Sequence, residues 1–252
     1  MEIFPMTKYV SAIALFAVAG AAQAAFFEAR SGDAGSLGSP ISYSGTLYQN
    51  VAFGSNVGPN QNLIPVFADL EFDSYVAVDT GPSTASFTAN GATPISFASA
   101  GGPFNNPGQI SNLWFINGEA GAVPNAAFGG AHAIFLGRFS FTGSQGTLSL
   151  GANGVVVDIV DPGTTNVGSV NTDSLLVKFT AFNSTVQSGL DGGDLSTHPT
   201  AFEYQLRLNS FQATVGATTY FVNDLYVVQI PTPGTIALAS LGGLLVARRR
   251  RA

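Results

Sequence analysis

The chain holds only two histidines, His132 and His198, the residue type that most often acts as a general acid or base. Serine and aspartate are plentiful, so a Ser–His–Asp arrangement stays open, but no Gly-x-Ser-x-Gly elbow supports it. No His-x-x-x-His pair offers a zinc site, and no cysteine is present to act as a nucleophile or thiolate ligand. We therefore expect structural or surface histidines and a protein that is not an enzyme.

Three carboxylates, Asp69, Glu71 and Asp73, alternate along residues 69–78, where the pattern predicts a half-buried strand. The apolar residues of this segment fall on the opposite face: Leu70, Phe72, Val76 and Val78. Neighbouring carboxylates on one strand face lie about 7 Å apart, which suits the acid/base pair of a glycoside hydrolase or the oxygen ligands of calcium. Charges on the wet face of a strand more commonly discourage edge pairing, and that is the role we expect.

A second calcium candidate is the sequence Asp191-Gly192-Gly193-Asp194. Glycine permits a sharp backbone turn, and the carboxylates of Asp191 and Asp194 could supply oxygen ligands together with carbonyl groups. The segment lacks the spaced acidic positions and the terminal glutamate of an EF-hand. A turn that merely uses aspartate and glycine is the favoured interpretation, and we expect no cofactor other than this weak calcium candidate.

Exposed aromatic rings would favour a carbohydrate-binding module. Trp114 is the only tryptophan, and its apolar neighbours Leu113 and Phe115 favour a place in the core. Tyr43 and Tyr48 remain as candidates for an exposed platform. Carbohydrate binding is therefore an alternative function, and a secreted hydrolase is a further one.

The elements that must position these residues are strands, because apolar residues recur with period two and no segment of the central region shows a helical period over three turns. Residues 203–209 alternate throughout, and residues 155–160 and 174–182 are apolar enough for central strands. Turn residues predict hairpins across three short segments: Gly143–Gly146, Gly151–Gly154 and Gly216–Ala217. Clusters of Pro, Gly and Asn predict long surface loops at 54–65, 100–108 and 117–130. We expect an all-β fold, a single antiparallel β-sandwich that resembles a jelly roll.

Composition narrows the class of protein. The chain has 252 residues, of which 46% are hydrophobic and 10% charged, with 20 Phe and no Cys. This is enough apolar material for one domain with a sizeable core, and it excludes a disordered chain and a disulfide scaffold. A net charge of −6 argues against nucleic acid as a partner, since phosphate contacts need a basic patch.

The first 24 residues have the features of a secretory signal. Lys8 precedes the apolar run 10–22, and Ala22-Gln23-Ala24 provides a small-x-small site for signal peptidase. Glu2 is unusual in such a leader, so translation could start at Met6 instead of Met1. An N-terminal membrane anchor is the alternative, but the apolar run is shorter than the roughly 20 residues of a spanning helix. We expect export and cleavage after Ala24.

The C-terminus combines a segment rich in proline and glycine, an apolar stretch and a basic end. Pro231-Thr232-Pro233-Gly234 interrupts the chain, residues 235–247 are apolar, and Arg248, Arg249, Arg250 and Arg251 follow. An apolar stretch that ends in arginines stops translocation with the charges on the cytoplasmic side. Helix from Pro233 to Ala247 would extend only about 22 Å against a hydrocarbon core of about 30 Å. The short transmembrane helix expected here therefore suits a transient anchor better than a permanent one.

This combination of motif, apolar helix, arginine tail and signal peptide resembles the PEP-CTERM sorting signal of exported bacterial proteins. The resemblance covers residues 231–252 and assigns Pro231 and Pro233 to the motif and Arg248–Arg251 to the basic tail. It implies recognition and cleavage by an exosortase, a membrane-embedded cysteine transpeptidase, at the inner membrane. It also implies delivery to the cell surface or an exopolysaccharide matrix of a Gram-negative-type bacterium. Thr232 replaces the central glutamate, which indicates a variant enzyme or different processing; a plain tail anchor is the alternative.

The expected organisation is a signal peptide at 1–24, a β-sandwich domain at 25–229 and a sorting signal at 230–252. Removing both ends leaves four basic and 14 acidic residues, a net charge of about −10. The sequence therefore predicts an exported surface or matrix protein without enzymatic activity, and it names no ligand.

Overall fold

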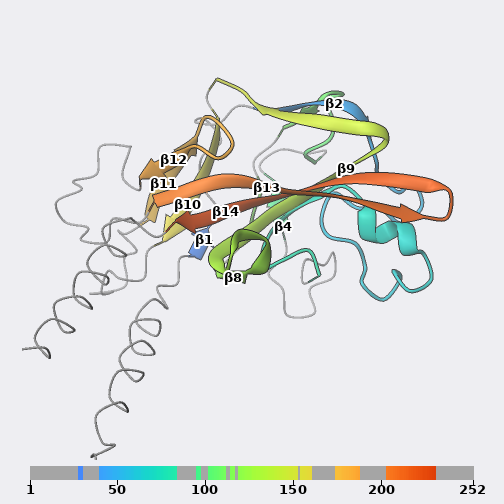
Figure 1. Ribbon diagram of the computed structural model, residues 1–252, viewed down its shortest axis with the longest axis horizontal. Helices are drawn as coiled ribbons and strands as arrows, with labels where there is room; N and C mark the ends of the chain where they lie inside the picture. The colour runs from blue at the N-terminus through green and yellow to red at the C-terminus, as the bar shows by residue number, and fades with distance from the viewer. Residues whose placement is uncertain are drawn as a thin grey trace, which may run out of the picture. The chain divides into compact units, whose positions relative to one another are not determined.

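The structure is a computed structural model, and it describes residues 28–30, 40–83, 95–97, 102–111, 114–116, 119–152, 154–160, 174–187 and 203–230 (Figure 1). Strands dominate this part of the chain, and the largest sheet is antiparallel. The all-β prediction is thereby confirmed. Two short 3-10 helices, η1 (Ala68–Phe72) and η2 (Ala126–Phe128), are the helices of the described residues, and neither is long and apolar enough to cross a membrane.

The large sheet has eight strands. Six of them are hydrogen-bonded side by side in the order β12-β13-β14-β9-β2-β5. The bounds of these six are β12 Thr185–Gln187, β13 Glu203–Val215, β14 Thr218–Ile230, β9 Ala131–Leu150, β2 Ile41–Leu47 and β5 Gln109–Ile110. Two more strands, β3 (Tyr75–Asp79) and β8 (Val123–Asn125), also pair with β9.

A second sheet has four strands in the order β11-β10-β1-β7, and two further strands, β4 and β6, pair with each other. Their bounds are β11 Ser174–Phe179, β10 Val155–Val160, β1 Glu28–Arg30, β7 Glu119–Gly121, β4 Ile95–Phe97 and β6 Trp114–Ile116. β10 is a central strand, as predicted, whereas β11 is the first strand in the order β11-β10-β1-β7 and stops at Phe179. The segment 117–130, predicted as a loop, contributes β7 and β8 instead.

β9, with 20 residues, organises the large sheet because other strands pair with both of its edges. β14 follows one edge from Ala133 to Thr142. β8, β3 and β2 pair with β9 one after another along its other edge. Each of them pairs with residues of β9 that also pair with β14, so they must lie on the edge opposite β14. β3 passes close to β9 at Gly137, where a Cβ would be 2.8 Å from the carbonyl oxygen of Tyr75. A side chain at this position would push β3 away from β9.

The predicted hairpin across Gly143–Gly146 is wrong. Residues 138–142 and 147–150 belong to one strand, β9, and both pair with β2 rather than with each other. Between Thr46↔Thr142 and Ser44↔Thr147, four residues of β9 lie opposite the single residue Gly45, so the glycine-rich segment forms a bulge. β9 and β2 change direction together at this point (Figure 1).

The other two predicted turns have different outcomes. Gly216 adopts a φ of +60°, and Val215 pairs with Thr218, so the two-residue hairpin between β13 and β14 is confirmed. A turn also forms at Gly151–Gly154, where the amide of Gly154 donates to the carbonyl of Gly151 at 2.8 Å. This turn makes no hairpin, because β9 belongs to the large sheet and β10 to the four-stranded one.

Side chains of both sheets share the main buried cluster. Val157, Val177 and Phe179 of the four-stranded sheet belong to the same cluster as Phe139 and Val227 of the large sheet. The opposite face of the large sheet is also covered, since Ala133, Phe135, Tyr226 and Val228 form a second cluster with Tyr75. Residues 133–141 of β9 and 222–229 of β14 are therefore buried on both faces, and the apolar stretches within them follow from this.

Candidate interaction surface

The three alternating carboxylates do not share a strand face, so the strand predicted for residues 69–78 is wrong over its first half. Residues Ala68–Phe72 form η1, in which amide groups bond back three residues: Leu70 to Phe67 at 3.0 Å, then Asp73 to Leu70 at 3.2 Å. Only Tyr75–Asp79 continue as β3. Glu71 is exposed, Asp69 is half-buried and Asp73 is fully buried, so they have three different environments. A 3-10 helix has three residues per turn, so five residues form fewer than two turns. Over so short a segment, alternating polar and apolar residues do not distinguish a 3-10 helix from a strand.

Asp73 holds the loop that follows β2. Its Oδ1 accepts a hydrogen bond from the amide of Asn50 at 2.8 Å, and its Oδ2 accepts one from the amide of Ser55 at 2.9 Å. Burial raises the pKa of Asp73 to about 6, and the nearby charge of Asp69 acts in the same direction, although the backbone hydrogen bonds oppose the shift. Asp73 is thus a structural acceptor for both ends of the loop 50–55.

Asp69 holds the same loop through side chains. Its Oδ2 accepts hydrogen bonds from the hydroxyl of Tyr48 at 2.7 Å and from Nδ2 of Asn50 at 2.9 Å. Burial raises the pKa of Tyr48 above its ordinary value, and the hydrogen bond to Asp69 adds to that shift. Tyr48 therefore remains a neutral donor, and Oδ2 of Asp69 accepts two hydrogen bonds from the loop side.

Asn50 connects these carboxylates to the loop itself. Its Oδ1 accepts hydrogen bonds from the amides of Ala52 and Phe53 at 3.0 and 2.9 Å, which is the geometry of an Asx turn. The amide of Gly54 then donates to the carbonyl of Asn50 at 2.9 Å. Gly54 has no room for a side chain, because a Cβ would meet that carbonyl and lie 2.8 Å from Oδ2 of Asp73. Every amide named here has a partner, so the backbone of 50–55 is fixed.

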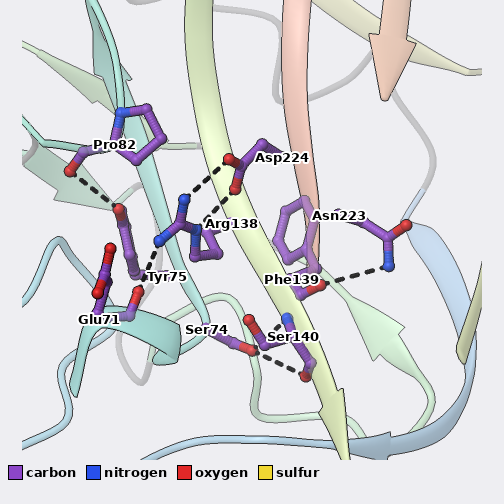
Figure 2. A network of polar contacts seen from close by, with 9 residues as sticks. All are labelled: Glu71, Ser74, Tyr75, Pro82, Arg138, Phe139, Ser140, Asn223 and Asp224. Carbon is purple, nitrogen blue, oxygen red and sulfur yellow. Dashed lines mark hydrogen bonds and ion pairs between the residues drawn. The ribbon is translucent and has the colours of Figure 1, made fainter. Parts of the chain in front are cut away.

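A buried ion pair attaches η1 to the large sheet (Figure 2). Nε and Nη2 of Arg138, on β9, donate to the two carboxylate oxygens of Asp224, on β14, at 2.7 and 2.9 Å. Nη1 of Arg138 points the other way and donates to the carbonyl of Glu71 at 2.6 Å. Burial raises the pKa of Asp224 against the opposing effect of Arg138. With both carboxylate oxygens bonded by one guanidinium, the pair is structural and leaves no group free for catalysis.

β3 is fastened to β9 beside this pair (Figure 2). The hydroxyl of Ser74 donates to the carbonyl of Ser140 at 3.3 Å and accepts from the amide of Ser140 at 3.0 Å. The hydroxyl of Tyr75 donates to the carbonyl of Pro82 at 3.2 Å. Ser74, which directly follows Asp73, is thereby held to the central strand β9, and Tyr75 is held to the segment that follows β3.

Aromatic packing fixes the same region from the β13–β14 hairpin. Phe72 stacks on Tyr220 with ring centroids 4.9 Å apart and an angle of 17°. Tyr48 packs edge-on against the same Tyr220, also at 4.9 Å. η1, the end of β2 and the hairpin of β13 and β14 therefore meet in one small cluster.

On the outside of this support lie four exposed apolar side chains, which we call the apolar loop patch: Val51, Phe53, Val66 and Phe67. Val51 is fully exposed, and Val66 retains 71% of its accessible surface. The rings of Phe53 and Phe67 join the two loops, with centroids 4.6 Å apart and an angle of 30°. Residues 34–68 contain no charged side chain, so the patch itself is uncharged. This uncharged run was the signal in the sequence that could have drawn attention to the patch.

The structure does not bring the other predicted site residues together. His132 is a half-buried residue of β9, opposite Pro124 of β8. Tyr43 is half-buried against Phe141, with ring centroids 5.9 Å apart. With Tyr48 bonded to Asp69, these two tyrosines form no exposed platform. Trp114 begins β6 opposite Phe97, and its place in the core stays a prediction.

The remaining predicted residues lie outside the described part of the chain. They are Ala22, Ala24, Asp191, Asp194, His198, Pro231, Thr232, Pro233, Gly234 and Arg248–Arg251. Within the described ranges, His, Asp and Glu side chains form no group of three or more that could hold a metal ion. Comparison with protein families, with curated proteins and with solved structures found no match.

Proposed function

We propose that this protein is an exported bacterial cell-surface or matrix protein without enzymatic activity, sorted through its C-terminal segment. The observation that carries the proposal is the order Pro231-Thr232-Pro233-Gly234, apolar residues 235–247 and Arg248–Arg251, together with the leader that ends at Ala24. In this proposal signal peptidase removes the leader, and an exosortase cleaves the C-terminal signal while the inner membrane holds it.

The end of β14 supports this proposal. β14 extends to Ile230, which pairs with Glu203, so the last strand of the large sheet ends directly before Pro231. Cleavage beyond Ile230 would leave the described strands and their core intact. Proline resists both helix and sheet pairing, so Pro231 and Pro233 would keep the cleaved segment extended.

For the fold, we propose that the two sheets form a β-sandwich related to a jelly roll, with terminal helices added only by the two sorting segments. The shared cluster of Val157, Val177, Phe139 and Val227 supports face-to-face packing of the sheets.

The test is an intact-mass measurement on the protein isolated from its native cells. We expect the mass of a chain that begins at Ala25 and has lost its C-terminal signal, with any added mass identifying the attached group. A chain that ends at Ala252 would contradict processing and would indicate a membrane tail anchor.

A further inference from the structure

The apolar loop patch has the size of a small-ligand site rather than of a protein interface. Val51, Phe53, Val66 and Phe67 together expose on the order of 400 Å². A specific protein interface takes about 800 Å² from each partner, roughly twice this area. Sites for small molecules combine an aromatic or apolar surface with a few fixed polar groups. The polar groups beside the patch therefore decide what it can bind.

The carboxylate of Asp69 lies close to the two rings of the patch. Phe67 precedes Asp69 by two residues in the chain. On the other loop, the amide of Phe53 donates to Oδ1 of Asn50 at 2.9 Å, and Nδ2 of Asn50 donates to Oδ2 of Asp69 at 2.9 Å. Asp69 is half-buried, and its Oδ1 accepts no hydrogen bond from the residues that the structure describes. A charged oxygen with unused lone pairs is a strong acceptor for a hydroxyl group.

An aromatic surface beside such an acceptor has the chemistry of a sugar site. One face of a pyranose ring presents C–H groups, which can lie against an aromatic ring, while the hydroxyls at its edge donate hydrogen bonds. A purely apolar ligand over the same rings would remove water from Oδ1 of Asp69 without replacing its hydrogen bond, which is unfavourable. The carboxylate therefore favours a ligand that carries hydroxyl groups.

Charge limits the sugars that fit. Residues 34–68 contain no Lys or Arg, and the next charged residues along the chain are Asp69 and Glu71. Carboxylate, sulfate or phosphate groups on a sugar would be repelled by these acidic residues, and the loops carry no basic side chain to bind them. The site therefore selects neutral carbohydrate.

We propose that the apolar loop patch and Asp69 together form a binding site for a neutral oligosaccharide. A pyranose ring lies with its C–H face on Phe53 and Phe67, and one of its hydroxyls donates to Oδ1 of Asp69. The site loses little conformational entropy on binding, because hydrogen bonds to Asp73 already fix the backbone of residues 50–55. Since the ligand is uncharged, binding should change little with salt concentration.

The test is affinity electrophoresis of the protein as isolated from its native cells, in native gels that contain dextran, laminarin, galactomannan or arabinoxylan. We expect retardation by at least one of these neutral polysaccharides, at low and at high salt, and none by the anionic polysaccharide alginate. Phe53→Ala should raise the dissociation constant at least tenfold, because it removes one of the two rings. The matched control is Phe211→Ala, which removes an exposed phenylalanine of β13 outside the patch and should leave binding unchanged.

A second variant separates the carboxylate from the rings. In Asp69→Asn the remaining oxygen can still accept from Tyr48 and Asn50, which turns the amide nitrogen, a donor, toward the ligand. This change should raise the dissociation constant at least fivefold, and near-ultraviolet circular dichroism would show that all variants keep the fold.

Three results would overturn the proposal. The first is that none of the four neutral polysaccharides retards the protein, and the second is that retardation persists unchanged in Phe53→Ala and Asp69→Asn. The third is binding to vesicles of phosphatidylcholine that depends on Phe53 without any binding of polysaccharide, which would assign the patch to a membrane surface. None of these outcomes depends on where the C-terminus is cleaved.

Discussion

Asn50 is the residue on which the apolar loop patch depends most directly. It accepts from two amides of its own loop, donates to Asp69 through its side chain and donates to Asp73 through its backbone. No other amide or carboxylate side chain could fill all three roles, because aspartate lacks the donor and glutamine is one carbon longer. The side chains of the patch are therefore positioned by the half-buried Asn50 and Asp69 and by the buried Asp73.

Replacing Asn50 tests this directly. Asn50→Ala should lower the free energy of unfolding by about 1–2 kcal/mol, because Asp69 and the amides of Ala52 and Phe53 lose their partner. Chemical denaturation would measure the change. Asn62→Ala, at an exposed asparagine of the neighbouring loop, serves as the control and should change stability by less than about 0.5 kcal/mol. Equal effects of the two substitutions would contradict the role given to Asn50.

Asp73 predicts a pH dependence. Its pKa is raised to about 6 in the folded protein, above that of an unfolded aspartate, so the folded state binds the proton more tightly. The stabilisation from this group is absent at pH 7 and develops as the pH falls through 6. Between pH 7 and pH 5 it should add on the order of 1 kcal/mol to the free energy of unfolding. Asp73→Asn should remove this increment in denaturation curves recorded at both values; an unchanged increment in the variant would refute the assignment.

Among the elements, β9 is the one that brings distant segments together. It pairs with β14 on one edge and with β8, β3 and β2 on the other, and its Arg138 reaches both β14 and η1. The bulge of residues 143–146 then turns β9 and β2 together. The patch is thus supported by an element more than 60 residues away in the sequence.

The Arg138–Asp224 pair predicts a non-additive mutational effect. Arg138→Met should destabilise the protein by about 3–5 kcal/mol, because it leaves the Asp224 carboxylate buried without a partner. Arg138→Met/Asp224→Leu should cost clearly less than the single change, since the buried charge is then absent. A double-mutant cycle from denaturation curves measures the difference. A double variant at least as unstable as Arg138→Met would contradict a purely structural pair.

The bulge of β9 offers a matched pair of glycine substitutions. A Cβ at Gly146 would overlap the ring of Phe141, whereas Gly143 has open space around it and a φ of +80°. Gly143→Ala should cost only the backbone strain of about 1–2 kcal/mol. Gly146→Ala should cost more, because the buried Phe141 ring must move. Thermal unfolding would rank the two, and the opposite order would show that the bulge is not packed as described.

At the scale of the whole molecule, the apolar loop patch and the start of the proposed sorting segment lie at opposite ends of β14. The C-terminal segment continues from Ile230, and the apolar loop patch lies beside Tyr220. Ten residue steps of a buried strand separate the two, so each can be altered without disturbing the other.

Neutralising the basic tail tests the sorting proposal in cells. Replacement of Arg248, Arg249, Arg250 and Arg251 by glutamine removes the charges that hold the segment on the cytoplasmic side. We expect loss of C-terminal processing and of surface delivery, measured by intact mass and by cell fractionation. Val51→Ser/Phe53→Ser serves as the control and should be processed normally. Normal delivery of the tail variant would refute the proposal.

The sequence alone determined what depends on local pattern and composition. Period-two alternation predicted the strand beginning at Glu203, and the pair Gly216-Ala217 predicted its hairpin, because both signals act over a few residues. The proposed sorting signals are equally local, and their prediction rests on the order of residues alone.

Only the tertiary structure decided which strands pair and what the carboxylates do. The glycines at 143 and 146 suit a hairpin or a bulge equally well, and pairing with β2 selects the bulge. Asp73 has the sequence pattern of a solvent-facing charge, yet it is buried because Asn50 and Ser55, about 20 residues earlier, supply its donors. The physical reason is the same in both cases: the partner that lowers the free energy lies far along the chain, where no local pattern can reveal it.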